Sequence, residues 1–314
     1  MAGPIKKSIL VIAGPTASGK TDLAMSVQTN SVIINGDSQQ LYKSFPCLSA
    51  LPTVEQMCQK PHRLYGILEA HQKCDVAAWT QWVKDEIRKA HENEDLPIIV
   101  GGTGFYLNTL LEGISFIPDV PNEVRQKSHE IEQRLGLSKL YEDLQKFDPP
   151  LYATFKPNDQ SRIIRAWCVY VATQTPLSTF QNGPKQGGIM DDFNVMILAL
   201  SPSPRSELYA RIDTRFVSMI KHGAIEEIQS FKKLDYYESL PAFRAIGAKE
   251  IDAYLMGKIG LEEAVALGQQ KSRNYAKRQL TWIRNKLPNA TLWGDFGDEK
   301  RSQEYLQSLL IHRT

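Results

Sequence analysis

The sequence lacks long apolar runs, cysteine clusters and low-complexity tracts, and each absence excludes a class of protein. No run approaches the roughly 18–20 apolar residues that a membrane span needs. The stretch Ser8–Ala13, behind Lys6 and Lys7, faintly resembles a signal peptide, but it is too short and has no small-residue cleavage pattern. The four cysteines form neither a CxxC pair nor a cluster with zinc-ligand spacing. We therefore expect free thiols, a cytoplasmic location and no membrane partner.

The composition is that of a folded protein with an uneven charge distribution. The 314 residues are 42% hydrophobic and 23% charged, which excludes a disordered tail, a collagen and a coiled-coil rod. The chain is about twice as long as a usual domain, so two structural units are expected. The formal net charge is +2, but residues 201–314 hold 18 basic and 14 acidic side chains. A site for a polyanion is therefore expected to draw on the C-terminal third.

The first third of the chain alternates short apolar runs with helical patterns. Residues 8–13, 31–34 and 97–100 are β-branched apolar runs, and each is followed by a glycine-bearing turn. Between the second and third runs, residues 76–90 have the periodicity of an amphipathic helix. This alternation predicts a parallel sheet with helices on both faces.

After this pattern the chain becomes helical and then returns to a strand. Asn122 is expected to cap the first of these helices, and the predicted helices cover residues 122–136, 138–147 and 159–173. Residues 194–200 again have the pattern of a buried strand. The chain after residue 204 is predicted to be almost wholly helical up to Leu287, and Pro288 is expected to end the last helix. The predicted domains are a core of residues 1–112 and 193–314 and an inserted helical domain of residues 113–192.

A phosphate-binding motif follows the first strand. Residues 14–21 have the sequence GPTASGKT and match G-x-x-x-x-G-K-[ST] in full. In such a loop the backbone N–H groups turn toward phosphate oxygens, and the helix N-terminus adds its positive end. The expected residues for a diphosphate are Gly14, Thr16, Ala17, Ser18, Gly19, Lys20 and Thr21, with the Thr21 hydroxyl on Mg²⁺. The motif and the alternation predict an α/β fold, a P-loop NTPase-like parallel sheet flanked by helices, with an inserted helical domain and a helical C-terminal part.

Asp37 is the only acidic residue at a predicted strand tip near this loop. It follows the strand at 31–34, whereas the strand at 97–100 runs into the glycine turn 101–104 without a carboxylate. P-loop kinases and hydrolases usually carry an acidic residue at such a tip to orient a nucleophile or a metal ion. Asp37 is therefore a candidate base or metal orienter. The alternative is that it only caps the following turn.

Seven segments together resemble the tRNA dimethylallyltransferases (isopentenyltransferases), which modify the adenosine next to the anticodon. They occur in the family's order: GPTASGKT at 14–21, DSQQLY at 37–42, GGTGFY at 101–106, PNDQSRIIRA at 157–166, RIDTR at 211–215, RAIGAKE at 244–250 and KRQLTWIR at 277–284. The family usually has a tyrosine where Ala248 stands and often a double arginine where Ser161 and Arg162 stand. The zinc finger of eukaryotic members is absent, so the chain resembles a bacterial-type enzyme.

This resemblance implies the transfer of a dimethylallyl group from dimethylallyl diphosphate to the exocyclic amine of that adenosine, with release of pyrophosphate. The implied catalytic residues are Asp37, Lys20, Thr103 and Arg215. Lys20 and the Mg²⁺ cofactor neutralise the leaving group, Arg215 or the neighbouring Arg211 adds a cation, and Asp37 accepts the amine proton. The implied partners are dimethylallyl diphosphate and the tRNA anticodon stem-loop, and the enzyme is expected to be a monomer.

Contacts with RNA must offset the cost of unstacking the adenosine. The last predicted helix is a candidate because residues 269–294 hold six basic side chains and no acidic one; the alternative is a merely solvated face. Thr103 is expected to hold the adenine or Asp37 through its hydroxyl, or else only to stabilise its turn. The residues predicted to contact tRNA are Asp37, Ser38, Gln39, Gln40, Thr103, Arg125, Gln160, Ser161, Arg162, Ile163, Ile164, Arg165, Arg244, Arg273, Lys277, Arg278 and Arg284.

Three other functions remain open on the sequence. A small-molecule kinase that transfers the γ-phosphate of ATP would explain the loop but not the basic helix. An enzyme that prenylates free AMP with the same allyl donor would explain the donor site equally well. An RNA-binding module without enzymatic activity would leave the phosphate loop without a role.

Overall fold

The computed structural model describes residues 6–287, 289–295 and 303–308 of the chain. The chain divides into two compact units, one of Met1–Leu111 with Ile189–Thr314 and one of Glu112–Gly188. The sequence placed these boundaries after residues 112 and 192. The first unit contains the phosphate-binding motif, and the second is the insertion. No helix in the described part of the chain is long and apolar enough to cross a membrane.

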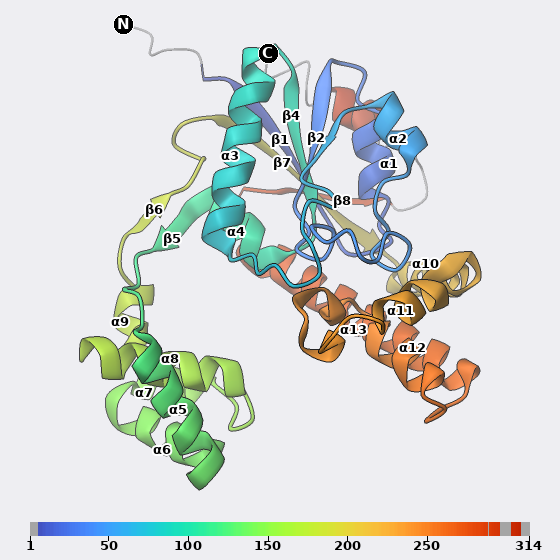
Figure 1. The fold of residues 1–314 in the computed structure, drawn as a ribbon. Helices are drawn as coiled ribbons and strands as arrows, with labels where there is room; N and C mark the ends of the chain where they lie inside the picture. Colours follow the sequence, from blue (N-terminus) through green and yellow to red (C-terminus); the bar gives the residue numbers. More distant parts are fainter. Residues whose placement is uncertain (1–5, 288, 296–302, 309–314) are drawn as a thin grey trace, which may run out of the picture. The chain divides into compact units, whose positions relative to one another are not determined.

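A six-stranded parallel sheet forms the centre of the first unit (Figure 1). Its strands, in spatial order, are β3 (His62–Arg63), β2 (Ser31–Asn35), β4 (Leu96–Gly101), β1 (Ser8–Ala13), β7 (Asn194–Ser203) and β8 (Thr291–Asp295). β1 pairs with β4 on one side and with β7 on the other, so the chain leaves the sheet after β4 and returns beside β1. Four strands were predicted from the sequence. β3 and β8 were not.

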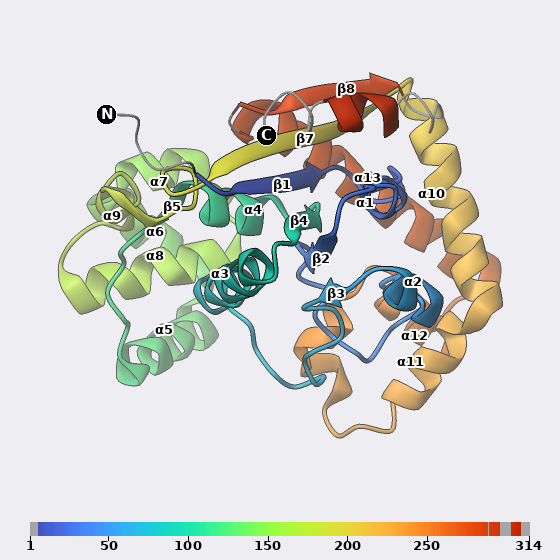
Figure 2. The same cartoon turned by 90° about the horizontal axis from the view of Figure 1, so that it is seen from above.

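The sheet is covered on both faces. In β1 the residues from Ile9 to Ala13 are all 0% exposed, and since side chains alternate between faces, both faces must be packed. On one face, Leu23 and Ala24 of α1 pack in the same core as Leu10 of β1 and Ile33 of β2. Figure 2 shows α3 and α4 on the opposite face. The helices that precede the inserted unit in the chain are α1 (Lys20–Met25), α2 (Val54–Gln59), α3 (Val76–Glu92) and α4 (Gly104–Glu112).

α3 shows why these segments become helical. The Asp75 side chain accepts a hydrogen bond from the Ala78 amide (2.8 Å) and so caps the first turn. Trp79, Val83 and Ile87 recur at helical spacing and are buried. The helix therefore begins where the sequence predicted and extends two residues beyond the predicted end.

The helical segment that follows β7 lies near the carboxyl ends of the strands (Figure 1). Its elements are α10 (Arg205–Met219), the π-helical turn η1 (Ile220–Ala224), α11 (Ile225–Phe231), the short 3₁₀ turns η2 (Tyr237–Ser239) and η3 (Pro241–Arg244), α12 (Ala248–Leu255) and α13 (Leu261–Lys286). β7 runs to Ser203, three residues beyond the predicted end of this strand, and the helices begin at Arg205. Pro288, expected to end α13, lies outside the described residues. Residues 303–308 are also helical.

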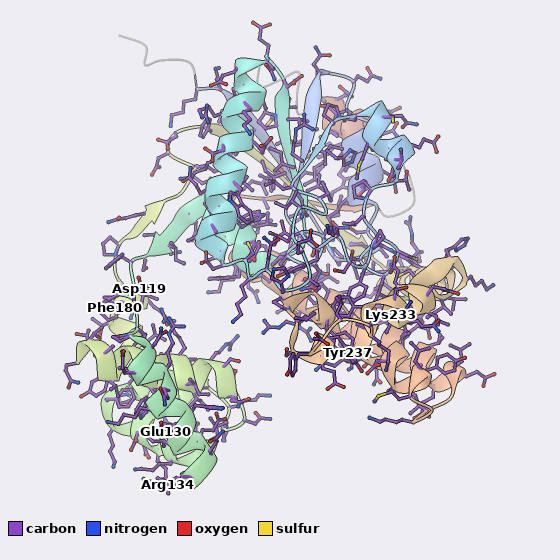
Figure 3. All side chains as sticks on the ribbon, viewed as in Figure 1. Asp119, Glu130, Arg134, Phe180, Lys233 and Tyr237 are labelled. Carbon is purple, nitrogen blue, oxygen red and sulfur yellow. The ribbon has the colours of Figure 1, made fainter. Side chains whose placement is uncertain are left out.

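The inserted unit consists of a two-stranded antiparallel ribbon and five helices. Its elements are β5 (Gly113–Ser115), α5 (Asn122–Leu135), α6 (Leu137–Phe147), α7 (Pro149–Thr154), α8 (Gln160–Thr173), α9 (Leu177–Gln181) and β6 (Lys185–Gly187). Leu140, Leu144 and Ile163 are fully buried in its own hydrophobic core. Figure 3 labels Glu130 and Arg134 on α5, and both are exposed.

One expectation for this unit is wrong. Asn122 does not cap α5, because the residue at the cap position is Pro121, which has no side-chain acceptor. Asp148 provides the kind of cap that was expected of Asn122. Its carboxylate accepts hydrogen bonds from the Leu151 amide (3.4 Å) and the Ser178 amide (3.0 Å), and so joins the starts of α7 and α9.

Candidate active site

The loop between β1 and α1 has the backbone shape of an anion-binding nest. Ala17 and Gly19 have left-handed backbones (φ 61° and 82°), a conformation that turns successive amides to one side. Gly14 has no room for a side chain, since a Cβ there would lie 2.7 Å from Ser18 Oγ. The Gly14 amide donates to the Gly101 carbonyl (3.3 Å), which fixes the start of the loop to the end of β4.

Two side chains of the loop are suited to a bound phosphate. Ser18 Oγ is buried and has no hydrogen-bond partner among the described residues, so an anion oxygen would satisfy it. Lys20 Nζ lies across the loop and donates to the Pro15 carbonyl (2.6 Å). Burial lowers the pKa of Lys20 to about 8, with the positive charge of Arg215 adding to the lowering and the negative charge of Asp37 opposing it.

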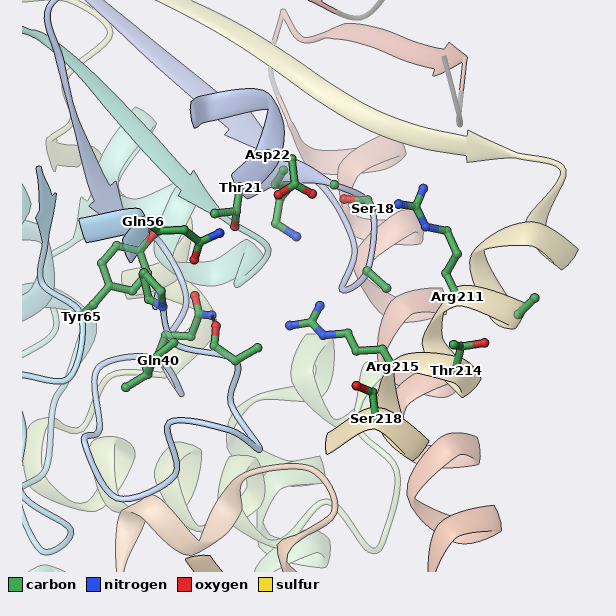
Figure 4. A pocket seen from close by; sticks show the side chains of 17 residues that line it. Ser18, Thr21, Asp22, Gln40, Gln56, Tyr65, Arg211, Thr214, Arg215 and Ser218 are labelled. Carbon is green, nitrogen blue, oxygen red and sulfur yellow. Dashed lines mark hydrogen bonds between the residues drawn. The ribbon is translucent and has the colours of Figure 1, made fainter. Parts of the chain in front are cut away.

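The loop forms one wall of a cavity of about 660 Å³, shown in Figure 4. Residues 17–22 line one side, and Arg211, Thr214, Arg215 and Ser218 of α10 line another. Arg215 points from that helix into the cavity. Gln40, Gln56 and Tyr65 close the cavity together with Ala50, Leu51 and Pro52. Burial and the Asp37 carboxylate raise the pKa of Tyr65, so its hydroxyl keeps its proton and stays a donor.

A second cavity, of about 290 Å³, adjoins the first. Asp37 lines it, together with Arg244, Tyr275 and Arg278. Ala17 and Arg215 line both cavities. Two ligands that occupy the two cavities would therefore meet beside Arg215.

Asp37 has the turn-capping contact that was the alternative to a catalytic role. Its Oδ1 accepts a hydrogen bond from the Gln39 amide (2.9 Å). Its own amide donates to Asn35 Oδ1 (2.7 Å), and Asn35 Nδ2 donates to the Asp37 carbonyl (3.0 Å). A carboxylate has two oxygens and about four acceptor sites, so this cap is compatible with a second role. The cap fixes the orientation of the carboxylate in the second cavity.

The position of Thr103 is compatible with both roles expected of it, which are to hold the adenine or Asp37 and to stabilise its turn. Its hydroxyl accepts a hydrogen bond from the Ser38 amide (3.1 Å), which joins the turns after β2 and β4. Tyr275 lies beside it: burial and the charge of Asp37 raise the pKa of the Tyr275 hydroxyl, and Thr103 and Arg278 partly oppose this change. Thr103 thus belongs to the polar network around Asp37.

The structure distinguishes Arg211 from Arg215 on α10. Arg211 and Arg215 both line the larger cavity, but only Arg215 reaches the second one as well. Burial lowers the pKa of Arg215, and the carboxylates of Asp37 and Asp22 oppose this change. An arginine beside two carboxylates stays protonated. Arg215 is therefore the better candidate for a cation at the reacting atoms.

The basic helix α13 has an apolar and a charged face. Ala276, Leu280 and Ile283 are buried, whereas Lys277 and Arg284 are exposed. A shallow depression of about 380 Å³ on this helix is lined by Lys277, Arg278, Thr281, Trp282, Asn285 and Lys286.

Two basic residues of α13 have partners that the sequence did not predict. Arg273 forms an ion pair with Asp213 of α10, and Lys271 forms one with Glu250 of α12. Arg273 therefore joins two helices, and its charge is already opposed by a carboxylate.

The remaining predicted RNA contacts lie in both units. Ser38, Gln39 and Arg244 line the second cavity, whereas the Gln40 amide donates to the carbonyls of Ser49 (3.0 Å) and Ala50 (2.6 Å) and supports the wall of the first cavity. Six of the predicted RNA contacts in the inserted unit are exposed or half-buried: Arg125, Gln160, Ser161, Arg162, Ile164 and Arg165.

Arg162 and Ile163 are neighbours on α8, but Arg162 is exposed and Ile163 is buried. Ile163 is 0% exposed in the core of the inserted unit, so its side chain offers no surface to RNA, and the contact predicted for this residue stays a prediction. Arg162 pairs with Asp159 (3.3 Å) and lies over the Phe155 ring.

Sequence reasoning missed the role of Gln279. It is 5% exposed on the packed face of α13, and its amide bonds to the phosphate-binding loop and to the turn after β4. Its signal in the sequence is a polar residue within the apolar stripe, between Ala276 and Ile283. Such a residue needs hydrogen-bond partners when buried, but the sequence does not say which.

The fold, the loop and the paired cavities define a P-loop α/β protein with a phosphate cradle beside a carboxylate-bearing cavity. A family model described as IPP transferase matches residues 40–286. The chain belongs to this family, which confirms the resemblance drawn from the sequence.

The relatives and solved structures agree with this assignment. A tRNA dimethylallyltransferase of Rhodospirillum centenum is 39% identical over 289 residues, with 91% of each chain covered, and one of Erythrobacter litoralis is 40% identical over 290 residues, with 90% of each covered. The solved tRNA isopentenylpyrophosphate transferase of Bacillus halodurans is 31% identical, with a TM-score of 0.69 over 98% of this chain and 97% of that one. A eukaryotic dimethylallyltransferase acting on tRNA is 25% identical, with a TM-score of 0.76 over 98% of this chain and 80% of that one. The P-loop NTPase-like fold predicted from the sequence is thereby confirmed.

Proposed function

We propose that the protein transfers a dimethylallyl group from dimethylallyl diphosphate to the exocyclic amine of the adenosine adjacent to the anticodon in tRNA and releases pyrophosphate. The observation that carries this proposal is the pair of cavities that share Ala17 and Arg215. One cavity offers a diphosphate cradle and the other a carboxylate. A transfer between two substrates needs two such sites that meet at one point.

The larger cavity receives the allyl donor. Its diphosphate sits against the amides of the loop, the ammonium of Lys20 and the buried hydroxyl of Ser18. As the bond between the allylic carbon and oxygen breaks, negative charge develops on the leaving pyrophosphate. Lys20 and Arg215 stabilise that charge from two sides.

The smaller cavity receives the unstacked adenine. The exocyclic amine is a weak nucleophile because its lone pair is delocalised into the ring. As the new carbon–nitrogen bond forms, Asp37 accepts a proton from the nitrogen, which leaves a neutral secondary amine. Thr103 and Tyr275 hold the carboxylate network and the base.

Mg²⁺ fits the donor site as a partner of the diphosphate. The described residues contain no group of three or more His, Cys, Asp or Glu side chains that could hold a metal ion, so a cage made only of protein is not expected. Mg²⁺ is commonly bound through one or two protein oxygens, water and substrate phosphates. The Thr21 hydroxyl would hold it there, with Asp22 beside it in the cavity, and it would neutralise charge on the leaving group.

The RNA is held by basic side chains at the second cavity and on the surface. We assign this role to Arg244 and Arg278, which line that cavity, to Lys277 and Arg284 on the exposed face of α13, and to three arginines of the inserted unit, Arg125, Arg162 and Arg165. Phosphate contacts of this kind provide affinity that falls with salt. The reaction takes place in the cytoplasm, where free thiols such as those of the four unpaired cysteines are usual. The active enzyme is a monomer.

One assay separates this function from its rivals. The purified protein is incubated with labelled dimethylallyl diphosphate, Mg²⁺ and either unmodified tRNA, AMP or no acceptor. Label in tRNA supports the proposal, and label in AMP alone supports an adenylate isopentenyltransferase. Turnover of ATP without allyl transfer supports a small-molecule kinase. A protein that binds tRNA and transfers nothing would be a binding module.

A further inference from the structure

The side chain of Gln279 joins three segments that are far apart in the sequence. Its Oε1 accepts a hydrogen bond from the Thr16 amide (2.9 Å), and its Nε2 donates to the Gly102 carbonyl (3.0 Å). The side chain is only 5% exposed. A buried glutamine in α13 therefore uses its acceptor on the phosphate-binding loop and its donor on the turn after β4.

The surroundings leave no freedom for this amide. A Cβ at Gly102 would lie 2.2 Å from Gln279 Nε2 and 2.6 Å from the Gly14 carbonyl oxygen. One turn later on α13, Trp282 packs on Gly104 so closely that a Cβ there would lie 2.3 Å from the indole. Both glycines provide the space in which α13 approaches the segment after β4. The close contact thus depends on the large side chains of α13 and on the absence of side chains at Gly102 and Gly104.

The same stretch of α13 faces the second cavity and the surface. Tyr275 and Arg278 line the cavity that contains Asp37, and Lys277 is exposed on the charged face. A shift of this helix relative to the loop would change the distance between the two cavities. Such a shift would misalign the donor and acceptor, and small misplacements at a reacting centre cost large factors in rate.

We propose that Gln279 is a positioning residue that holds the phosphate-binding loop and α13 in register, and so sets the separation of the diphosphate cradle from Asp37. It touches neither substrate and acts through the Thr16 amide and the Gly102 carbonyl. An apolar residue of the same size would leave both backbone groups buried without partners. This inference rests on the proposed function, because it assigns to Gln279 the alignment of two substrates.

Two variants at this position and one control test the inference. Gln279→Met keeps the volume and removes both hydrogen bonds, whereas Gln279→Glu keeps an acceptor for Thr16 and restores the donor to Gly102 only when protonated. Gln269→Met is the matched control, because Gln269 Nε2 on the same helix donates to the Asp213 carbonyl (3.1 Å) rather than to the loop. Circular dichroism first shows that each variant is folded.

We expect Gln279→Met to lower kcat for allyl transfer by about tenfold or more, the effect of losing a buried hydrogen bond at the aligned site, with tRNA affinity within about twofold. We expect the activity of Gln279→Glu, relative to the native protein, to rise as pH falls from 8 to 6. Gln269→Met should keep its kcat. If Gln279→Met does not fold, the pH profile of Gln279→Glu alone decides.

A second measurement separates this inference from the proposed function. Calorimetry with inorganic pyrophosphate and Mg²⁺ reports the state of the cradle whatever reaction follows, and Gln279→Met should bind pyrophosphate at least about fivefold more weakly. A native protein that binds pyrophosphate but transfers no allyl group would overturn the proposed function alone. An unchanged kcat and unchanged pyrophosphate affinity in folded Gln279→Met, or an equal loss in Gln269→Met, would overturn the role of Gln279.

Discussion

The affinity of the protein for dimethylallyl diphosphate should fall as pH rises through about 8. Burial lowers the pKa of Lys20 from its ordinary value of 10.5 to about 8, with Arg215 adding to the change and Asp37 opposing it. A lysine with this pKa is about 90% charged at pH 7 and about 10% charged at pH 9. If the ammonium carries the contact with the diphosphate, the association constant falls by about tenfold between these two pH values.

The measurement is isothermal calorimetry with dimethylallyl diphosphate at half-unit steps from pH 6.5 to 9.5, without tRNA so that no turnover occurs. Lys20→Arg is the control, because a guanidinium stays charged throughout this range. The ionisation of the diphosphate itself is common to both proteins and cancels in their ratio. A ratio that does not change with pH would refute the argument, since it would mean that the charge on Lys20 does not govern donor binding.

The same pKa predicts the stability of the ligand-free protein. Between about pH 8 and 10.5 the unfolded chain binds more protons at Lys20 than the folded one, so stability rises with pH in this window. Below about pH 8 the cost of the buried ammonium is fully present. Lys20→Met should therefore stabilise the protein at pH 7, by at most about 3 kcal/mol, and the gain should vanish toward pH 10.5. Thermal unfolding at pH 7 and at pH 10 measures the difference.

Asp37→Asn should lower single-turnover transfer by about 10²–10⁴-fold, the usual contribution of a general base, while filter binding shows tRNA affinity within a few-fold; intact turnover would exclude Asp37 as the base. Lys277→Gln with Arg284→Gln should reduce the slope of log affinity for tRNA against log salt by about 1.4–1.8, whereas Arg273→Gln, which loses an ion pair with a carboxylate, should leave it nearly unchanged; an unaltered slope in the double variant would make that face merely solvated. Leu280→Ala should lower the free energy of unfolding in urea by about 2–5 kcal/mol, because Leu280 is 1% exposed; a loss below about 1 kcal/mol would show that the α13 packing is not as described.

The parts of the fold that were predictable are those with a strong local signal. β1 and the central strands are unbroken β-branched runs, and a strand buried on both faces leaves such a run in the sequence. β3 is only the pair His62 and Arg63, too short to show any period. β8 has an exposed Leu292 in its middle and is a strand because it pairs with β7. Its identity comes from tertiary pairing, which local propensity does not contain.

The site divides in the same way. The loop at 14–21 could be found because its glycines and lysine are contiguous. The ion-pair partners of individual charged residues could not be found, because these partners lie on other helices. Asp213 lies between Arg211 and Arg215 in the sequence, but its ion-pair partner in the structure is Arg273 of α13. The sequence also grouped Ile163 with the basic residues of its motif, although helical geometry turns that position into the core.

The central position of β1 determines when the protein can be completed during synthesis on the ribosome. Leu10 lies opposite Ile98, but Ser8 lies opposite Asn194, so the sheet stays open until the whole insertion has been made. The insertion pairs Gly113 with Gly187 and has its own core, and we expect it to fold before its host, since it depends on nearer contacts. The phosphate-binding loop is among the first segments to emerge, yet its partner on α13 is among the last. A ribosome stalled before that helix would therefore carry the motif without a finished cradle.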